Sequence, residues 1–228
     1  MKAYKGFNKD GTCRGFKFEE GQTYREDKAK LCRAGFHACE DPLDCLQYYA
    51  PGSSDYREVE LEEVSPERQD DSKVCAKVIK IGAKISVRQI CDLHFDFVRS
   101  KCTTEKSGGD ESSLSGGDRS SLSGGDRSSL SGGDESSLSG GYRSSLSGGD
   151  RSVTAGMGSA SVGKNGLAVV RGNGCKVRGG IGAVLVIAEE RHISRDIDKW
   201  RAVVVDGEQV KPDTWYTLQN GELVEADT

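Results

Sequence analysis

Long hydrophobic stretches are missing from this sequence. No run of about 18 apolar residues occurs in the chain, so no transmembrane helix is predicted. The first residues, MKAYKGFNKDGTCRGFKF, also lack the apolar segment of a secretory signal. We therefore expect a cytoplasmic protein with no membrane partner.

The chain also lacks a large net charge of either sign. The formal net charge of −4 gives no general attraction to nucleic acid or to anionic lipid, so no nucleic-acid partner is expected. The eight cysteines include no CxxC pair, and in a cytoplasmic protein we expect them to be reduced thiols. A zinc site is the alternative, because four ligand-type residues lie close together in the sequence: Cys32, His37, Cys39 and Cys45. Their spacing is not that of a zinc finger, and neither a metal nor another cofactor is predicted.

Motifs of known catalytic sites are also lacking. The sequence contains no GxSxG nucleophile elbow and no GxxxxGK[ST] phosphate loop. Its three histidines, at positions 37, 94 and 192, are far apart in the chain. No catalytic residue is predicted, and we expect a non-enzymatic protein.

Glycine and serine are abundant, and they follow a strict period. Residues 107–186 form ten octads in one frame, from SGGDESSL and SGGDRSSL to GKNGLAVV and GGIGAVLV. The first six octads have the composition of a flexible linker, but the last four keep the period in apolar sequence that favours β-strands. A linker has no reason to place one leucine at every eighth position. The period therefore predicts a β-solenoid, in which stacked octads bury a ladder of apolar side chains.

Each octad divides into a turn, SGGD, and a short strand such as RSSL. We expect the glycines to provide positive φ at the turn, and the leucine and the serine two residues before it to share one face. Two octads per coil would make a narrow roll of two sheets. The predicted core positions are Leu114, Leu122, Leu130, Leu138, Leu146, Val162, Val170 and Val186.

Charged residues also recur in the octads. The fifth position forms a predicted surface ladder, whose basic members are Arg119, Arg127, Arg143 and Arg151. We expect the preceding aspartates to accept hydrogen bonds from turn amides and to pair with these arginines. Glycine-rich repeats with aspartate also raise calcium binding as an alternative.

The segments on either side of the repeat resemble ordinary folded protein. Residues 1–104 are predicted to be an α+β domain, with strands at KAYKGF, REVELEEV and KVCAKVIKIG and helices at DPLDCLQYY and SVRQICDLHFDFVRS. Residues 187–228 contain alternating strand patterns and the turn signals DG and NG, so they predict a β cap on the solenoid. The predicted fold class is therefore mixed: an α+β domain (1–104), an octapeptide-repeat β-solenoid (107–186) and a C-terminal β cap (187–228).

Motifs in the N-terminal segment resemble those of two groups of proteins. The motifs CRGF, GFHAC, PLD and YY, followed by short Gly/Ser repeats, resemble an uncharacterised family from bacteriophages and gut bacteria. This resemblance implies a phage or prophage protein, located in the host cytosol. The block GFHACEDPLDCLQYY with the strand REVELEEV is also similar to the centre of ADP-ribosyltransferase folds. That second likeness implies a strand carrying Gly35 and His37, a helix carrying Leu46 and Tyr49, and a glutamate at 58 or 60.

These patterns support three hypotheses for function. The first is a binding or assembly protein whose solenoid acts as a rigid spacer, an oligomerisation surface or a ligand-presenting surface, with a second copy or another protein as partner. The second is a phage counter-defence protein that sequesters a nucleotide-type signal, and the third is an active or degenerate ADP-ribosyltransferase. The candidate binding residues are Arg14, His37, Tyr49, Arg171, Lys176 and Arg178.

Overall fold

The computed structural model of the chain describes residues 1–68 and 72–227, and it is mostly β-structure. About half of the chain is strand and about a tenth is helix, with a β-solenoid of about five turns between residues 104 and 188. The predicted fold class is thereby confirmed. The chain divides into two compact units, Met1–His94 and Phe95–Thr228, so the solenoid and the cap belong to one unit.

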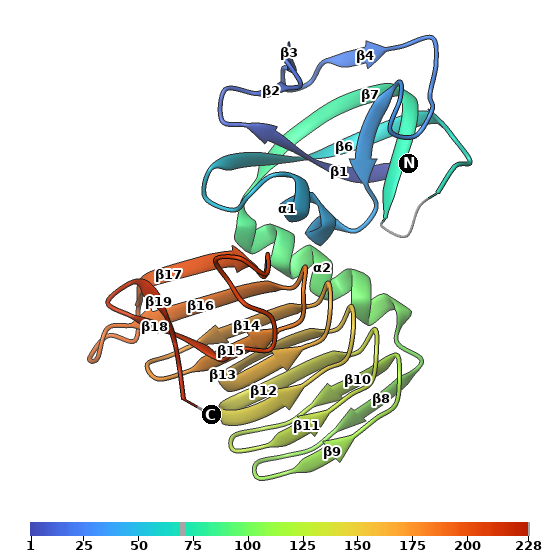
Figure 1. Cartoon of the computed structure of the whole chain (residues 1–228). Helices are drawn as coiled ribbons and strands as arrows, with labels where there is room; N and C mark the ends of the chain where they lie inside the picture. The colour runs from blue at the N-terminus through green and yellow to red at the C-terminus, as the bar shows by residue number, and fades with distance from the viewer. Residues whose placement is uncertain (69–71, 228) are drawn as a thin grey trace. The chain divides into compact units, whose positions relative to one another are not determined.

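Unit 1 is built around a curved antiparallel sheet (Figure 1). Its elements are β1 (Lys2–Asn8), β2 (Thr12–Cys13), β3 (Phe16–Lys17), β4 (Thr23–Arg25), β5 (Phe36–Cys39), the 3-10 helix η1 (Pro42–Asp44), α1 (Cys45–Tyr48), β6 (Ser54–Val64) and β7 (Lys73–Ile85). The strand order is β4-β7-β5-β1-β6, and β6 pairs with β7 as well. This extra pairing closes the sheet on itself around a core that includes Phe7, Val59 and Ile79.

The local sequence signals of unit 1 are confirmed. All three predicted strands form, as β1, β6 and β7. Asp41 caps η1 by accepting a hydrogen bond from the Leu43 amide at 2.9 Å. The capping box also forms, because Ser86 and Gln89 exchange backbone-to-side-chain bonds at the start of α2 (Val87–Lys101). The boundary between the two units falls inside α2, at His94 and Phe95.

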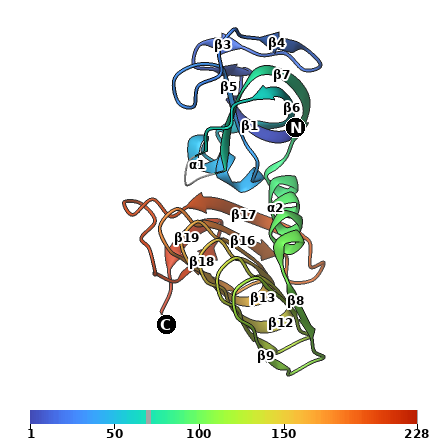
Figure 2. The ribbon, with the colours of Figure 1, turned by 90° about the vertical axis from the view of Figure 1, so that its right-hand side faces the viewer.

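Unit 2 begins within α2 and consists mainly of strands, most of which follow one another around the solenoid (Figure 2). They are β8 (Thr104–Ser107), β9 (Ser113–Ser115), β10 (Ser120–Ser123), β11 (Ser129–Ser131), β12 (Ser137–Ser147), β13 (Val153–Val162), β14 (Leu167–Arg171), β15 (Lys176–Gly179), β16 (Val184–Glu190), β17 (Ile197–Val204), β18 (Tyr216–Gln219) and β19 (Glu222–Glu225). No helix in the described part of the chain is both long and apolar enough to cross a membrane.

Two octads make one coil of the solenoid. Leu122 pairs with Leu138 and Leu130 pairs with Leu146 in parallel ladders, so equivalent residues are 16 positions apart. Four of the predicted core leucines, at 122, 130, 138 and 146, are fully buried, while Leu114 in the first coil is partly buried. The serines two residues before them, such as Ser120 and Ser136, are also buried. The shared inward face of leucine and serine is therefore confirmed.

The octad frame does not persist through the apolar coils. Leu146 pairs with Ala160, which is 14 residues later, and Ala160 pairs with Val177, which is 17 residues later. Register shifts shorten the corner that contains Met157, and the RGNGC turn at 171–175 lengthens the next one. The leucine ladder thus continues through Ala160, Ala168, Val177 and Leu185.

These frame shifts correct one predicted core residue. Val162 and Val170 lie two positions beyond the ladder residues, which keeps them on the inward face, and both are buried. Val186 lies one position beyond Leu185, so its side chain turns to the other face and is only half-buried. The prediction of Val186 as a core residue was wrong for that reason.

The turn chemistry was also predicted wrongly. Positive φ in the low-complexity octads occurs at the charged fifth position, for example 55° at Arg119 and 53° at Glu135, and not at the glycines. The glycines are needed for space instead. A Cβ on Gly132 would lie 2.8 Å from the Cβ of Ser136, and one on Gly133 would lie 2.2 Å from Asp118 Oδ1 in the preceding coil. Glycine here permits close stacking of coils, whereas the left-handed conformation is carried by arginine and glutamate.

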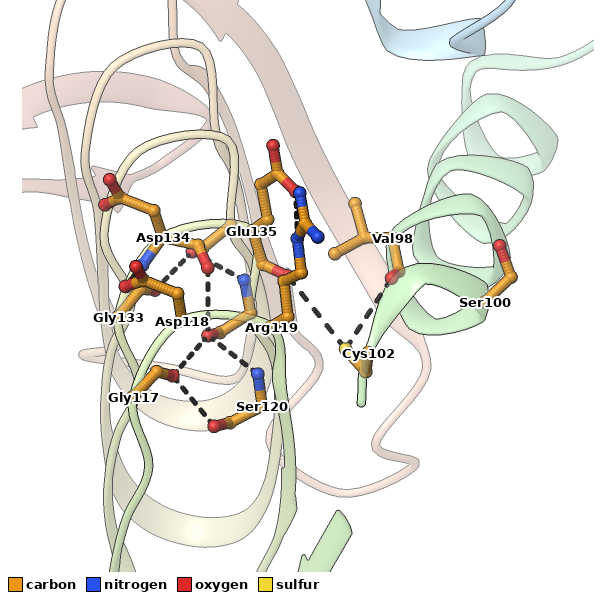
Figure 3. Close-up of polar contacts among 12 residues, drawn as sticks. Val98, Ser100, Cys102, Gly117, Asp118, Arg119, Ser120, Gly133, Asp134 and Glu135 are labelled. Atoms are coloured by element: carbon orange, nitrogen blue, oxygen red, sulfur yellow. Dashed lines mark hydrogen bonds and ion pairs between the residues drawn. The ribbon is translucent and has the colours of Figure 1, made fainter. Parts of the chain in front are cut away.

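Polar ladders connect the corners of successive coils (Figure 3). Asp118 Oδ1 accepts a hydrogen bond from the Asp134 amide at 2.9 Å, and the Arg119 amide donates to the Asp134 carbonyl at 2.8 Å. The same aspartate-to-amide bond recurs along both corners, which confirms that the aspartates bond turn amides. For Arg119 and Arg127 the predicted aspartate partners were wrong, because Arg119 pairs with Glu135 and Arg127 pairs with Glu111, each at 2.9 Å. With 16 residues per coil, the expected single charge ladder becomes two columns, one on each corner.

The two ends of the solenoid differ. At the C-terminal end, β17 pairs antiparallel with β16, and the β18–β19 hairpin follows β15, so the predicted β cap forms. At the N-terminal end, β8 and β9 each pair with one neighbour among the described residues. Lys106 on β8 stands in register with Leu122, and its Nζ donates to the Ser115 carbonyl at 2.6 Å. A charged residue at the leucine position disfavours the addition of another strand at this sheet edge.

Candidate binding site

A cavity of about 570 Å³ in unit 1 lies among β1, β5, the β2–β3 hairpin and α1. Seven aromatic residues line it, among them Phe16, Phe18, Tyr24 and Phe36. Its basic lining residues are Lys5, Arg14, Arg25, Arg33 and Lys73, whereas Glu26 is its one acidic residue among those described. The cavity is therefore both aromatic and strongly electropositive.

Lys5 is the buried cation of this cavity. It lies on β1 between the core residues Ala3 and Phe7 and is only 9 % exposed. Its Nζ donates to the His37 carbonyl at 2.9 Å and lies 5.6 Å from the centroid of Phe7 and 6.0 Å from that of Phe18. No carboxylate of the described residues is within ion-pair distance of it. A buried ammonium whose charge is offset only by a carbonyl and ring faces costs stability.

Arg14 enters the site on a tight hairpin. The turn joining β2 and β3 consists of Arg14 and Gly15, whose φ angles are 50° and 81°. Two successive positive φ values are typical of a type I′ turn, which matches the twist of the strands it connects. The Arg14 side chain is exposed, and the described residues offer it no ion-pair partner.

His37 is held as a neutral imidazole. Its Nε2 accepts a hydrogen bond from the Cys32 amide at 2.8 Å, an arrangement that protonation at Nε2 would break. Burial lowers the pKa of His37, and the neighbouring cations Lys5, Arg14 and Lys73 lower it further. The imidazole thus contributes an uncharged ring and a backbone carbonyl to the site, with no positive charge at neutral pH.

We expect acid to destabilise unit 1 through His37. The pKa of this side chain is lower in the folded chain than its unfolded value of about 6.5, so its contribution to stability is present above that pH and is lost as the pH falls through the folded pKa. Imidazole NMR signals should show His37 titrating below pH 6.5, and the acid-induced loss of stability should be smaller in His37→Gln. A His37 pKa at or above about 6.5 would contradict this assignment.

Tyr49, directly after α1, also lines the cavity. Its ring lies against Gly6, where an added Cβ would be 2.5 Å from the ring, so glycine is needed at that position of β1. The Tyr49 hydroxyl donates to Cys13 Sγ at 3.0 Å, and burial raises the pKa of the phenol. Three of the six predicted binding residues, Arg14, His37 and Tyr49, are therefore brought together in one cavity.

Residues 1–93 match the model of a domain of unknown function, DUF7666. The match covers all of the cavity residues and stops before the solenoid. No curated protein and no solved structure gives a significant match to the chain. The DUF7666 match agrees with an uncharacterised family for the N-terminal segment.

The other three predicted binding residues do not form a common site. Arg171 Nε pairs with the buried Glu190 at 2.5 Å, and Lys176 Nζ donates to the Asp227 carbonyl. Arg178 lies over the ring of Trp215, with 4.7 Å between the guanidinium carbon and the centroid. Arg171 lines a separate groove of about 360 Å³ in unit 2, which includes neither Lys176 nor Arg178.

The residues of the transferase likeness are partly assembled. His37 lies on β5 and Leu46 on α1, while Tyr49 directly follows α1. Glu58 and Glu60 lie on β6, where they pair with Lys2 at 2.8 Å and Lys80 at 3.3 Å. Neither glutamate lines the cavity that contains His37.

The four ligand-type residues of the zinc alternative do not converge. Cys32 donates its amide to the His37 ring, and no group of three or more His, Cys, Asp or Glu side chains in the described residues has the arrangement of a metal site. The eight thiols, all within the described part of the chain, form no disulfide.

Lys5 was missed by the sequence analysis. Its signal was the alternation Ala3, Lys5, Phe7, which places a lysine on the core face of a strand.

Proposed function

We propose that this chain is a non-enzymatic binding protein in which the solenoid is a rigid spacer and the DUF7666-like domain carries the ligand site. The repeating bonds between coils support this proposal most directly. Successive coils of the low-complexity octads repeat the leucine contact at 16-residue intervals, with Thr154 in place of leucine beside Leu138, and they repeat the aspartate-to-amide bond at the same interval. Such a stack resists bending and can gain or lose coils without changing its cross-section.

The strand edges favour a spacer over assembly by strand addition. The exposed Lys106 on the terminal strand β8 is in register with Leu122, so a strand that paired with β8 would have to accommodate its charge at the leucine position. A second copy or another protein partner would therefore use side-chain surfaces. The exposed serines at 113, 115, 129 and 131 form one such surface.

Distance measurements on shortened chains test the spacer. Spin labels introduced by unnatural amino acids at Ser100 and Asn220 avoid the native cysteines, and pulsed EPR then reports their separation. We expect a narrow distribution. Removing residues 115–130, one full coil, should shift its centre by up to about 5 Å without broadening it.

Removing only residues 123–130 serves as the matched control. Loss of a single octad moves all preceding residues by half a coil, so Ser100 comes to the opposite sheet and the distance changes by more than in the coil deletion. A broad distribution that both deletions leave unchanged would contradict the rigid spacer and restore the linker interpretation.

The second hypothesis, sequestration of a nucleotide-type signal by a phage or prophage protein, is favoured by the cavity of unit 1. An excess of cations and a lining of aromatic rings suit an anionic aromatic molecule better than a protein partner. The same cavity contains neither Glu58 nor Glu60, so its residues support binding more readily than ADP-ribosyl transfer.

A further inference from the structure

We propose that the cavity of unit 1 binds a small anion carrying a planar ring, of mononucleotide type, and that Lys5 is its buried cationic anchor. This inference rests on the proposed function, because it takes the DUF7666-like domain to be the part that binds. It adds the chemical class of the ligand and a residue, Lys5, that is absent from the candidate binding residues of the sequence analysis.

The first observation is the environment of Lys5. The ammonium group has three N–H bonds, but among the described residues only the His37 carbonyl accepts one, at 2.9 Å, and the residue is 9 % exposed. Natural interiors rarely retain such a charge without a carboxylate. A ligand oxyanion in the cavity would supply the missing negative charge and accept the remaining N–H bonds.

The second observation is the pair of arginines at the rim. Arg14 on the β2–β3 turn and Arg33 before β5 both line the cavity, both are exposed, and neither has an ion-pair partner among the described residues. Arg25, by contrast, is already paired with Glu63. Two unpaired guanidinium groups next to a buried ammonium suit a phosphate or a similar polyoxygen anion.

The third observation selects a ring as the other part of the ligand. Phe18 is at the centre of edge-to-face contacts with Phe16, Tyr24 and Phe36, at centroid distances of 4.7, 5.1 and 6.1 Å. Phe16 is nevertheless 51 % exposed, so part of this aromatic wall faces open space. An exposed ring beside a cationic pocket offers a stacking surface for a planar heterocycle.

Calorimetric titration of the full-length chain tests the proposal with four probes. AMP and UMP carry both the ring and the phosphate, adenosine carries the ring alone, and inorganic phosphate carries the charge alone. We expect at least one nucleotide to bind, and both adenosine and phosphate to bind at least about tenfold more weakly.

Lys5→Met isolates the anchor, because methionine fills similar space without charge. We expect nucleotide affinity to fall by about tenfold or more while the melting temperature stays equal or rises, since the variant no longer buries a cation. Lys2→Met is the matched control: Lys2 is on the same strand, pairs with Glu58 and does not line the cavity. It should bind as the unaltered chain does.

Three results would overturn the inference: neither nucleotide binds, adenosine binds as tightly as AMP, or Lys5→Met retains full affinity. Tight adenosine binding would leave the domain a binding domain and reject only the anionic class. The distance measurements on the solenoid are made without ligand, so the spacer and the ligand class can fail separately.

Discussion

Replacing Leu138 by alanine is expected to lower the free energy of unfolding of the solenoid by about 3 kcal/mol. Leu138 is fully buried and stacks between Leu122 in one neighbouring coil and Thr154 in the other. Because Thr154 is short and held by the parallel ladder, the surrounding side chains cannot fill the space that the leucine leaves. Calorimetry should show a melting temperature lower by roughly 6–12 °C.

Leu114→Ala provides the control for this prediction. Residues 107–114 and 131–138 have the same sequence, SGGDESSL, so the two leucines differ only in their place in the stack. Leu114 lies in the first coil, pairs only with Leu130 among the described residues and is partly buried. We expect its loss to cost about 1 kcal/mol or less. Equal effects of the two substitutions would be incompatible with a stacked leucine ladder.

Most of the fold could be predicted from the sequence, because its signals are local and periodic. The capping pair Ser86 and Gln89, the Asp41 cap and the NG turn before β19 each act over three or four residues. The octad period specifies the solenoid and its leucine ladder for the same reason: identical units must stack identically. The solenoid and its leucine ladder can be derived from the interactions between neighbouring coils alone.

The corners were less predictable, since a period does not reveal how many residues a corner needs. The corner AGMGS (155–159) has two residues fewer than SGGYRSS (139–145), the corresponding corner of the preceding coil. Both segments are rich in small residues, so their composition does not reveal the difference. Glycine was interpreted as a source of positive φ, although here it provides room for Asp118 of the neighbouring coil. That contact joins residues in different coils, and sequence patterns within one octad do not contain it.

The candidate site was predictable only in part. Arg14, His37 and Tyr49 belong to distinctive motifs, and the closed sheet of unit 1 brings them together. Arg171, Lys176 and Arg178 are close in sequence, but strand alternation and the cap direct them to separate partners. For Lys5, the alternation with Ala3 and Phe7 indicates the core face of a strand, but its burial depends on the pairing of β1 with the distant strands β5 and β6.

Adding a single methyl group at Gly133 is expected to disrupt the stack. A Cβ there would lie 2.2 Å from Asp118 Oδ1 and 2.7 Å from the Asp118 backbone nitrogen. The Asp118 side chain could rotate away from the methyl group if it gave up its hydrogen bond to the Asp134 amide. The contact with the Asp118 backbone nitrogen is relieved only if the whole coil shifts. We expect Gly133→Ala to cost about 2 kcal/mol by overpacking.

Gly109→Ala is the matched substitution, in an octad of identical sequence. Gly109 belongs to the first coil, and an added Cβ would meet nothing within 4 Å. Neither glycine has positive φ, so backbone strain does not distinguish them. The two glycines lie on opposite corners of the coil, and the contact that an added methyl group would make differs because only Gly133 has a preceding coil beside it.

Comparing the melting temperatures of Gly133→Ala and Gly109→Ala by differential scanning calorimetry tests the central claim most directly. A stacked solenoid predicts a decrease of roughly 4–8 °C for Gly133→Ala and a change of about 1 °C or less for Gly109→Ala. Indistinguishable melting temperatures would show that the two identical octads have identical surroundings, which contradicts the stack and the spacer built on it.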